Sequence, residues 1–419
     1  MPDEVKPSGT WHDRIPSSAK IVPNIYRLPI TMLSGTNEQT GLTEMQRQVS
    51  EIVQHGVIDP NFKFNDSDFE LLSTLRYDPG FTATTAAIPM QNEASRNWPD
   101  FGNVDPLLSA VDLRASLPEN ESLPHDETSL FRLLSDTHRD NGPPSPPPEL
   151  VDEDLTNIPE SVLLNTFYNR FLLLGEQFQR LTLTLNYFGW DFEVPFALLL
   201  EKLIMALPCR LSASTNLHTR MQSLYNDRKC YKMRILVSSS GKMRIEAHEI
   251  PSSPFHHSSS TQYFIDTILG GLIDKPNEEP WDIFIDTQAL TASPFTTFKT
   301  TKRNHYNEAR SRMQELRSTI TNPRAKSEIL LYNNAFELME GSITNVAVLQ
   351  DKPEGSGTFY QTPYLSTGCL CGVMRYYLLS KKLLNEGQTD VRDLRVGDSI
   401  LLFNGVMGCV RGIIRNSLQ

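Results

Sequence analysis

The pattern of apolar and polar positions in the C-terminal third of the chain predicts short strands joined by tight turns. Residues 330–336 predict a strand that runs into a turn, and the β-branched run at residues 343–349 predicts its return strand. Glu340 lies between these two runs, at the predicted turn. A solvated carboxylate is the ordinary interpretation of a glutamate at a turn, so the meaning of Glu340 depends on the residues that follow it.

A run of small residues comes next. Residues 366–372 read Ser-Thr-Gly-Cys-Leu-Cys-Gly and lead into an apolar run with helical spacing that continues to Leu384. Small residues at this point allow a helix to begin with its first N–H groups unbonded. Such a helix start binds anions, because free N–H donors and the positive end of the helix dipole converge there, and phosphate is the natural ligand.

An acidic turn beside a phosphate-binding helix start suggests pyridoxal phosphate. That cofactor needs a phosphate cradle, a carboxylate at its pyridine nitrogen and a lysine at its aldehyde. Lys299 stands at the end of an apolar segment, where partial desolvation lowers the pKa of an amine and favours its neutral form. Lys302 is the competing candidate, and composition alone does not choose between them. The helix predicted after them has one face formed by Tyr306, Ala309, Met313, Leu316 and Ile320.

Similar patterns predict the remaining elements. Residues 69–77 predict a strand that ends at an Asp-Pro-Gly turn. Residues 231–250 predict a hairpin around a Ser-Gly turn. Two helices follow residue 159, the first carrying Arg180 and the second opened by Pro195. The other predicted elements are a helix at 43–53, an apolar helix at 263–272, a strand at 283–285 and a hairpin at 400–410.

Composition limits the classes of function. The chain has 419 residues, enough for two or more domains. Its formal net charge of −11 and its lack of a basic patch argue against a nucleic-acid partner, but a local site can be positive in an acidic protein and bind a small anion. No apolar stretch reaches the roughly 20 residues of a membrane span. The N-terminus lacks the features of a signal peptide, so we expect a cytoplasmic protein without membrane contact.

The cysteines argue against disulfides and metal. Their number, five, is odd and small for this length, which indicates reduced thiols. Cys369 and Cys371 form a lone Cys-x-Cys pair without matching histidine or cysteine ligands, so they give little support to a zinc site. We expect no metal, and we interpret these two cysteines as small residues packed near the cofactor loop.

Changes in composition divide the chain into domains. Residues 1–64 predict an N-terminal extension, residues 65–280 a smaller α/β domain, and residues 281–419 a larger domain with the lysine and the phosphate cradle. Within the smaller domain, residues from about 82 to 158 are polar and rich in proline, and such a composition buries little surface. We interpret this stretch as a disordered or surface insertion. A polyproline docking segment is the alternative.

Several long segments resemble one known family, the fold-type IV pyridoxal-phosphate enzymes. This group includes branched-chain and D-amino-acid aminotransferases and 4-amino-4-deoxychorismate lyases, and the chain is most similar to the fungal lyases. The resemblance extends over most of the chain after about residue 66, apart from the insertion, and it implies a two-domain α+β fold of the D-amino-acid aminotransferase type. The segments that carry it are residues 69–81, 298–301, 338–348, 367–372 and 402–409.

The resemblance assigns cofactor contacts to individual residues. It implies that Lys299 bonds the cofactor aldehyde and that Glu340 binds the pyridine nitrogen. It also implies that Arg180 binds the phosphate, together with the main-chain N–H groups of Val373 and Met374.

Two positions depart from the usual pattern of the family. Gln177 stands where the family has the histidine of a His-x-x-Arg-Leu segment, which leaves the arginine in place. Met374 stands where many aminotransferases have a threonine whose hydroxyl also binds phosphate. The loss of that donor is compatible with the lyase branch but removes a contact that retains the cofactor.

The implied reaction converts 4-amino-4-deoxychorismate to 4-aminobenzoate, the folate precursor, and pyruvate, with Lys299 as general base at the amine-bearing carbon. For the substrate carboxylates the resemblance suggests Arg234, with Arg76 as a weaker candidate. As a further substrate contact we expect the hydroxyl of Thr300, or alternatively that of Thr301, to assist Lys299 in protonating the departing group. A cross-strand ion pair with Glu246 is an equally good interpretation of Arg234.

Two other functions are compatible with the same residues. An aminotransferase of the same fold, acting on D- or branched-chain amino acids, shares Lys299, Glu340 and Arg180, so these residues do not distinguish it from a lyase. A catalytically inactive interaction protein is the alternative from another class, and the presence of all three residues argues against it. Enzymes of the resembled family have their sites near a dimer interface, so we expect a homodimer.

Overall fold

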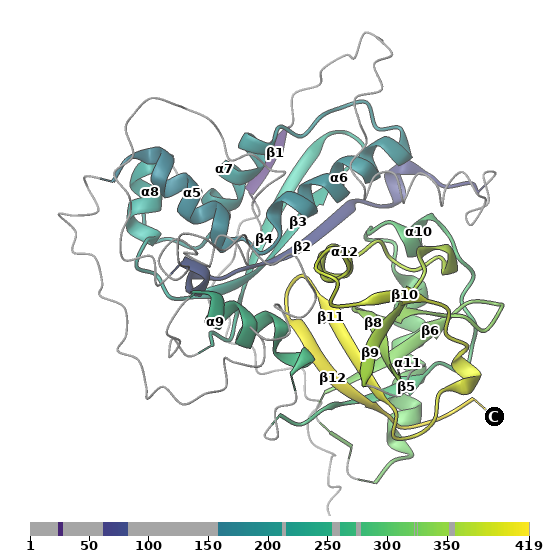
Figure 1. The fold of residues 1–419 in the computed structure, drawn as a ribbon. Coiled ribbons are helices and arrows are strands. Elements are labelled where there is room, and N and C mark those ends of the chain that lie inside the picture. The colour runs from purple at the N-terminus through teal and green to yellow at the C-terminus, as the bar shows by residue number, and fades with distance from the viewer. Residues whose placement is uncertain are drawn as a thin grey trace, which may run out of the picture.

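Two β-sheets of four and eight strands lie next to each other, with helices around them (Figure 1). The structure, a computed structural model, describes residues 24–27, 62–82, 158–211, 215–253, 260–273, 278–321, 323–324, 326–351 and 357–418. The helix predicted at 43–53 and residues 83–157 of the predicted insertion lie outside the described residues.

The smaller sheet is antiparallel and has the strand order β1-β4-β3-β2. Strands β3 and β4 confirm the predicted hairpin, and Gly241 adopts the left-handed backbone conformation in its turn, with a φ of 74°. Strand β1 belongs to the segment predicted as an N-terminal extension and pairs with β4. The four strands are β1 (Asn24–Arg27), β2 (Leu71–Tyr77), β3 (Cys230–Val237) and β4 (Lys242–Ile250).

Four helices pack beside this sheet. Helix α6 confirms the predicted helix that carries Arg180: it buries Leu181 and Leu185 and ends at Gly189, which is left-handed with a φ of 66°. Helix α7 begins directly after Pro195, as predicted. The helices are α5 (Glu160–Arg170), α6 (Leu174–Phe188), α7 (Phe196–Ala206) and α8 (Leu217–Leu224).

The larger sheet is mixed and has the strand order β10-β9-β8-β11-β12-β5-β6-β7. Strand β5 runs parallel to both of its neighbours, β6 and β12. Strands β11 and β12 confirm the predicted C-terminal hairpin. The strands are β5 (Trp281–Ile285), β6 (Ser327–Tyr332), β7 (Leu338–Gly341), β8 (Asn345–Asp351), β9 (Thr358–Pro363), β10 (Asn385–Gly387), β11 (Ser399–Asn404) and β12 (Gly408–Ile414).

The predicted pairing around Glu340 is wrong. The return strand of β6 is β7, which carries Glu340 itself, whereas β8 pairs with β9 and β11. The chain reverses earlier than predicted because Asn333 Oδ1 accepts hydrogen bonds from the N–H groups of Ala335 and Glu337, and Phe336 adopts a left-handed conformation with a φ of 62°. Glu340 therefore lies in a strand and not at a turn.

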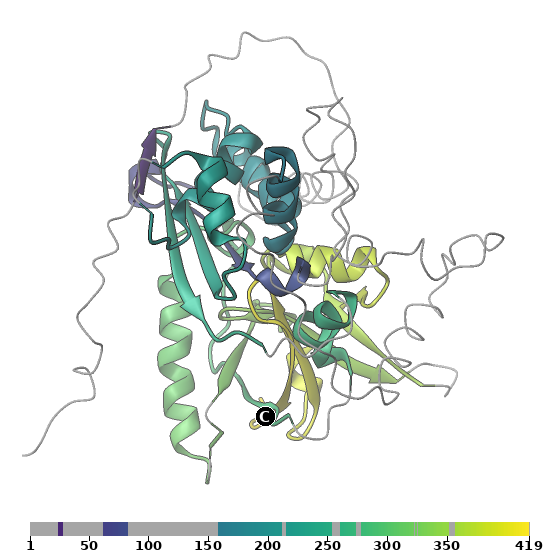
Figure 2. The same cartoon turned by 90° about the vertical axis from the view of Figure 1, so that its left-hand side faces the viewer.

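The helices and helical turns from residue 260 onward pack on this sheet. Helix α11 confirms the predicted helix after Lys299: Tyr306, Ala309 and Met313 are buried and pack in one apolar cluster with residues of β5 and β6. Figure 2 shows this long helix beside the larger sheet. These elements are α9 (Ser260–Phe264), the π-turn η3 (Ile265–Leu269), the 3₁₀ turn η4 (Gly270–Leu272), α10 (Pro294–Thr297), α11 (Asn304–Ser318) and α12 (Val373–Ser380).

Strand β2 connects the two sheets. It is an edge strand of the smaller sheet, and the backbone groups on its outer side form hydrogen bonds with residues from the segment of the chain that contains the larger sheet. The N–H of Leu72 donates to the carbonyl of Lys299 at 2.9 Å, and the N–H of Thr301 donates to the carbonyl of Glu70, just before β2, at 2.9 Å. Farther along, the N–H of Arg76 donates to the carbonyl of Gly405 at 3.1 Å. These bonds hold the candidate lysine at the junction of the sheets.

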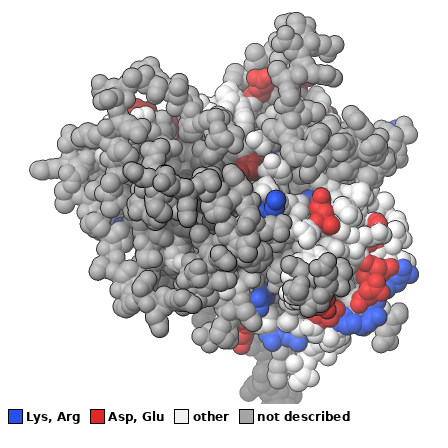
Figure 3. All heavy atoms as spheres, viewed as in Figure 1, with Lys and Arg blue, Asp and Glu red and all other residues white. Residues whose placement is uncertain are grey.

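Charged residues of both signs lie next to each other on the described part of the face shown in Figure 3, over the larger sheet. No helix within the described ranges is long and apolar enough to cross a membrane.

A buried ion pair at the end of β2 gives a stability prediction. Asp78 is fully buried and accepts hydrogen bonds from Arg76 Nε at 2.7 Å, the N–H of Gly80 at 2.9 Å and the hydroxyl of Tyr263 at 3.0 Å. We expect Asp78→Asn to destabilise the protein by about 2–4 kcal/mol, because it leaves the buried guanidinium of Arg76 without its counter-charge. The midpoint of urea or thermal unfolding measures this.

Asp390→Asn is the matched control. Asp390 also pairs with an arginine two residues away, Arg392, but this pair is much more exposed, with side-chain exposures of 31% for Asp390 and 56% for Arg392. Its unfolding midpoint should stay close to that of the wild type. Equal shifts for the two variants would contradict the role given to the Asp78 pair.

Candidate active site

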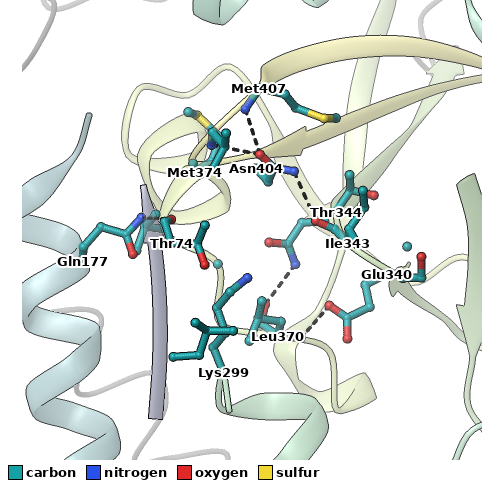
Figure 4. Close-up of a pocket in the computed structure, with 18 of the residues that line it drawn as sticks. Thr74, Gln177, Lys299, Glu340, Ile343, Thr344, Leu370, Met374, Asn404 and Met407 are labelled. Carbon is teal, nitrogen blue, oxygen red and sulfur yellow. Dashed lines mark hydrogen bonds between the residues drawn. The ribbon is translucent and has the colours of Figure 1, made fainter. Parts of the chain in front are cut away.

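A cavity of about 410 Å³ lies where β2 meets the larger sheet. Its volume is in the range of small-molecule sites. Thr74 of β2 and Gln177 of α6 line one side, and Glu340 and Thr344 line the other (Figure 4). The side chain of Lys299 projects into the space between them (Figure 4).

Lys299 is held at the junction by its backbone bond to Leu72 of β2. Burial lowers the pKa of its amine well below the ordinary value, and the nearby positive charges of Arg180 and Arg303 lower it further. Within the described residues its Nζ has no hydrogen-bond partner. This environment favours a neutral, nucleophilic amine.

Lys302, the competing lysine, is not among the residues that line the cavity. Its Nζ lies 5.0 Å from the ring centre of Phe295, on which its charge is stabilised by a cation–π contact. Of the two lysines named from the sequence, Lys299 is the one at the cavity.

Glu340 presents a buried carboxylate to the same cavity. Its Oε1 accepts a hydrogen bond from the hydroxyl of Tyr306 at 2.6 Å, and its Oε2 accepts one from the N–H of Leu370 at 3.2 Å. Burial raises the pKa of Glu340 to about 7, although both hydrogen bonds and the charges of Arg303 and Lys299 favour its ionised form. The sequence predicted Tyr306 only as a residue of an apolar helix face, so its bond to Glu340 was missed.

The loop before α12 is held by Asn345. The amide of Asn345 donates to the carbonyl of Leu370 at 3.0 Å, which keeps the N–H of Leu370 directed at Glu340. A side chain at Gly372 would clash with Asn345, because its Cβ would lie 1.8 Å from Asn345 Oδ1. Glycine at this position therefore allows the loop and Asn345 to pack together.

Helix α12 begins at Val373 with Gly372 as its N-cap, and Val373 and Met374 line the cavity. The first N–H groups of a helix have no partner within the helix. The predicted anion-binding helix start is therefore at the cavity.

Arg180 lies across the cavity on α6 and is buried. Its Nη2 donates to Gln177 Oε1 at 2.8 Å and to Ser73 Oγ at 3.3 Å. Within the described residues no carboxylate pairs with it. Burial lowers the pKa of Arg180 to about 10, which expresses the cost of a buried charge without a counter-ion. An anion in the cavity would supply that counter-ion.

Gln177, the residue in place of the family's histidine, orients this arginine. Its Nε2 donates to the carbonyl of Thr74 at 3.0 Å, and its Oε1 accepts from Ser73 Oγ at 2.6 Å as well as from Arg180. The side-chain amide of Gln177 is thus fixed between β2 and the guanidinium of Arg180, and it serves as the hydrogen-bond acceptor that orients this guanidinium.

The residues named for substrate binding are not all at the cavity. Arg234 lines it and also donates to Glu246 Oε2 at 2.7 Å across the hairpin, which is the cross-strand ion pair that the sequence offered as the alternative to substrate binding. Arg76 does not line the cavity and pairs with Asp78, which corrects its proposed place near the substrate. Thr300 is buried outside the cavity lining, and its hydroxyl accepts a bond from the N–H of Lys302 at 3.2 Å.

Two basic cavity residues were missed. Lys232 shares a face of β3 with Arg234, two positions away, and that spacing on a predicted strand was the available signal. Arg303 precedes α11, and its guanidinium lies 4.3 Å from the ring centre of Tyr306 and donates to the carbonyl of Ser342 at 2.5 Å. No local pattern indicates that Arg303 turns toward the cavity.

A second buried carboxylate, Glu328 of β6, shapes the cavity wall. It is fully buried and accepts hydrogen bonds from the N–H and hydroxyl of Ser342, the N–H of Ile343 and the hydroxyl of Thr344. These bonds fix the turn between β7 and β8, and with it the carbonyl of Ser342 that holds Arg303. No motif or periodic pattern in the sequence distinguishes Glu328 from other glutamates.

Comparison with known proteins identifies the family. Residues 167–413, more than half of the chain, match the sequence profile described as amino-transferase class IV. The chain belongs to the class IV aminotransferase family, and its fold is the α+β fold-type IV architecture that the sequence predicted.

Particular members of the family are similar to this chain. An aminodeoxychorismate lyase from Saccharomyces cerevisiae is 40% identical over 377 residues, which are 83% of this chain and 93% of the yeast protein. Solved structures that align with the chain include the 4-amino-4-deoxychorismate lyase from Pseudomonas aeruginosa, at 14% identity with a TM-score of 0.39, covering 59% of this chain and 79% of that one. Another is the branched-chain amino acid aminotransferase from Escherichia coli, at 13% identity with a TM-score of 0.38, covering 58% and 70%.

The raised pKa of Glu340 predicts a pH-dependent effect on stability. Between the ordinary pKa of 4.5 and the folded-state value of about 7, the folded protein keeps a proton that the unfolded chain releases. Stability from this group is therefore lost as the pH rises through that window. Glu340→Gln does not titrate, so we expect its stability relative to wild type to increase by about 2–3 kcal/mol between pH 5 and pH 8.

Urea unfolding of the cofactor-free proteins at several pH values measures this difference. Glu337→Gln, a partly exposed carboxylate on the neighbouring turn, serves as the control. A difference between Glu340→Gln and wild type that is constant from pH 5 to pH 8 would contradict the raised pKa.

Proposed function

We propose that this protein is a pyridoxal-phosphate-dependent lyase that converts 4-amino-4-deoxychorismate to 4-aminobenzoate and pyruvate. The observation that carries the proposal is the convergence of Lys299, Glu340 and Arg180 on one cavity in a chain that is 40% identical to a yeast aminodeoxychorismate lyase. The charged side chains that line the cavity are mostly basic, namely Arg180, Lys232, Arg234, Lys299 and Arg303 against Glu340, which suits an anionic substrate.

The residues around the cavity fit the cofactor. Arg180 is buried without a carboxylate partner among the described residues, and the start of α12 offers free N–H groups, so together they suit a phosphate. Glu340 is a buried carboxylate fixed by two hydrogen bonds and suits a protonated pyridine nitrogen, whose charge would favour its ionised form. Lys299 supplies the amine for the aldehyde.

Pyridoxal phosphate, when bound, supplies an electron sink that stabilises negative charge at the carbon bearing the substrate amine. Lys299 would be released when the substrate amine replaces it at the aldehyde, and with its lowered pKa it would then be a neutral amine that removes the proton from this carbon as general base. The neighbouring ring C–O bond to the enolpyruvyl group then breaks, and the electron pair leaves with the oxygen. Protonation of the departing group gives pyruvate, and the ring becomes aromatic as 4-aminobenzoate.

The same residues would serve an aminotransferase, and the family's description as aminotransferases keeps that function as the second candidate. An aminotransferase returns the proton to the cofactor and needs a keto-acid acceptor, whereas the lyase needs none. The yeast relative favours the lyase.

Three further features belong to the proposal. We place the protein in the cytoplasm, and we expect a homodimer because related enzymes have their sites near a dimer interface. We also keep the division into an extension (1–64), a smaller domain (65–280) and a larger domain (281–419). Sedimentation of the purified protein tests the dimer.

The reaction is tested by incubating the cofactor-loaded protein with aminodeoxychorismate in the absence of any keto acid. We expect 4-aminobenzoate and pyruvate in equal amounts over many turnovers. Release of neither product, together with keto-acid-dependent transfer of amino groups from D- or branched-chain amino acids, would replace the lyase by the aminotransferase.

Lys299→Ala should abolish both turnover and the visible absorbance of lysine-bound cofactor. Among the described residues Lys232 is the other lysine that lines the cavity, and it lies in β3 of the smaller sheet. Lys302→Ala, three residues away and outside the cavity lining, is the matched control and should retain both properties. Borohydride reduction followed by peptide mass spectrometry should find the cofactor on Lys299. A label on Lys302 would move the role to that residue.

A further inference from the structure

Three basic side chains form one wall of the cavity. Lys232 and Arg234 project from the same face of β3, and Arg303 reaches the cavity from the start of α11. Arg234 has a carboxylate partner, Glu246, at 2.7 Å. The wall therefore carries two more positive charges than negative ones, in a protein whose formal net charge is −11.

Lys232 and Arg303 have no carboxylate partner among the described residues. Lys232 is half-buried and makes no hydrogen bond to another described side chain. Burial lowers the pKa of its amine, repulsion by Arg234 and Arg303 lowers it further, and the charge of Glu246 opposes this only in part. Like charges kept this close without a counter-ion are expected where a ligand supplies the counter-ion.

Arg303 is oriented for an anion. One donor of its guanidinium bonds the carbonyl of Ser342, and the guanidinium carbon lies over the ring of Tyr306, 4.3 Å from its centre. These two contacts fix the guanidinium while its other N–H donors have no partner in the described part of the chain. A fixed guanidinium binds a carboxylate with less loss of side-chain entropy than a mobile one.

We propose that Arg303 and Lys232 bind the carboxylates of the substrate, a role for which the sequence suggested Arg234 and Arg76. This inference rests on the proposed function, because aminodeoxychorismate carries two carboxylates and so matches the two unpaired positive charges. Arg303 follows Lys299 by four residues, and its ring contact, Tyr306, bonds Glu340, so a carboxylate on Arg303 lies close to the reacting groups. Arg234 remains held by Glu246 and contributes less.

The test uses Arg303→Met and Lys232→Met, which remove each charge but keep an unbranched side chain of similar reach. With cofactor-loaded enzyme and aminodeoxychorismate, we expect each variant to raise KM roughly 10- to 100-fold, the range for a lost hydrogen bond to a charged group. Unchanged absorbance of the bound cofactor would separate substrate binding from cofactor binding. Arg303→Lys should recover part of the affinity.

Lys302→Met is the matched control, because it removes a positive charge next to Arg303 from a side chain that lies on Phe295 and outside the cavity lining. Its KM should stay within about twofold of wild type. Arg234→Met tests the alternative that Arg234 binds the substrate. If KM rises more in this variant than in Arg303→Met and Lys232→Met, the role belongs to Arg234 and the proposal is overturned.

Chorismate separates this proposal from the proposed reaction. It carries the same two carboxylates with a hydroxyl in place of the amine, so its dissociation constant, measured by calorimetry, reports carboxylate binding without turnover. We expect Arg303→Met and Lys232→Met to weaken chorismate roughly 10- to 100-fold. Equal affinities in variants and wild type overturn the carboxylate site, whereas an inactive wild-type enzyme that binds chorismate through these residues overturns only the reaction.

Discussion

The free edge of strand β2 is the constraint on which the site depends. An edge strand exposes unpaired N–H and C=O groups, and here the backbone of Lys299, Thr301 and Gly405 satisfies several of them. Because the lysine segment is one of these partners, the two sheets can only meet with Lys299 between them. The cavity is the space left where the edge of one sheet meets the larger sheet, and it collects side chains from β2, β3, β7 and the start of α12.

Electrostatics at this junction differ from those of the whole chain. The sequence is acidic, but Arg180, Lys232 and Arg303 face the cavity without carboxylate partners in the described part of the chain. Glu340 is the buried acid that opposes them, and hydrogen bonds from Tyr306 and Leu370 support its charge. Burying charged groups without a partner of opposite charge costs free energy when no ligand is bound. In the proposed function, the phosphate and protonated ring of the cofactor and the carboxylates of the substrate would supply the missing counter-charges.

Much of the local structure was predictable because it follows from periodicity and turn residues. The helices around Arg180 and Tyr306, the hairpin of β3 and β4 and the C-terminal hairpin all have patterns that repeat within a few residues. The pairing of β6 was predicted wrongly because the side chain of Asn333 closes a turn that apolar periodicity does not reveal. Arg303 and Glu328 were missed for a related reason: their importance comes from partners distant in sequence.

The sequence by itself determined the family, the order of most helices and strands, and the residue types needed for the chemistry, because motifs and periodic patterns are local properties of the chain. Only the tertiary structure decided that Lys299 and not Lys302 lines the cavity, and that Arg76 pairs with Asp78 away from it. It also decided that Arg234 is held by Glu246 while Lys232 and Arg303 form no ion pair with any carboxylate in the described ranges. Burial and pairing of a charge depend on which distant segments pack around it, and no local pattern of residues carries that information.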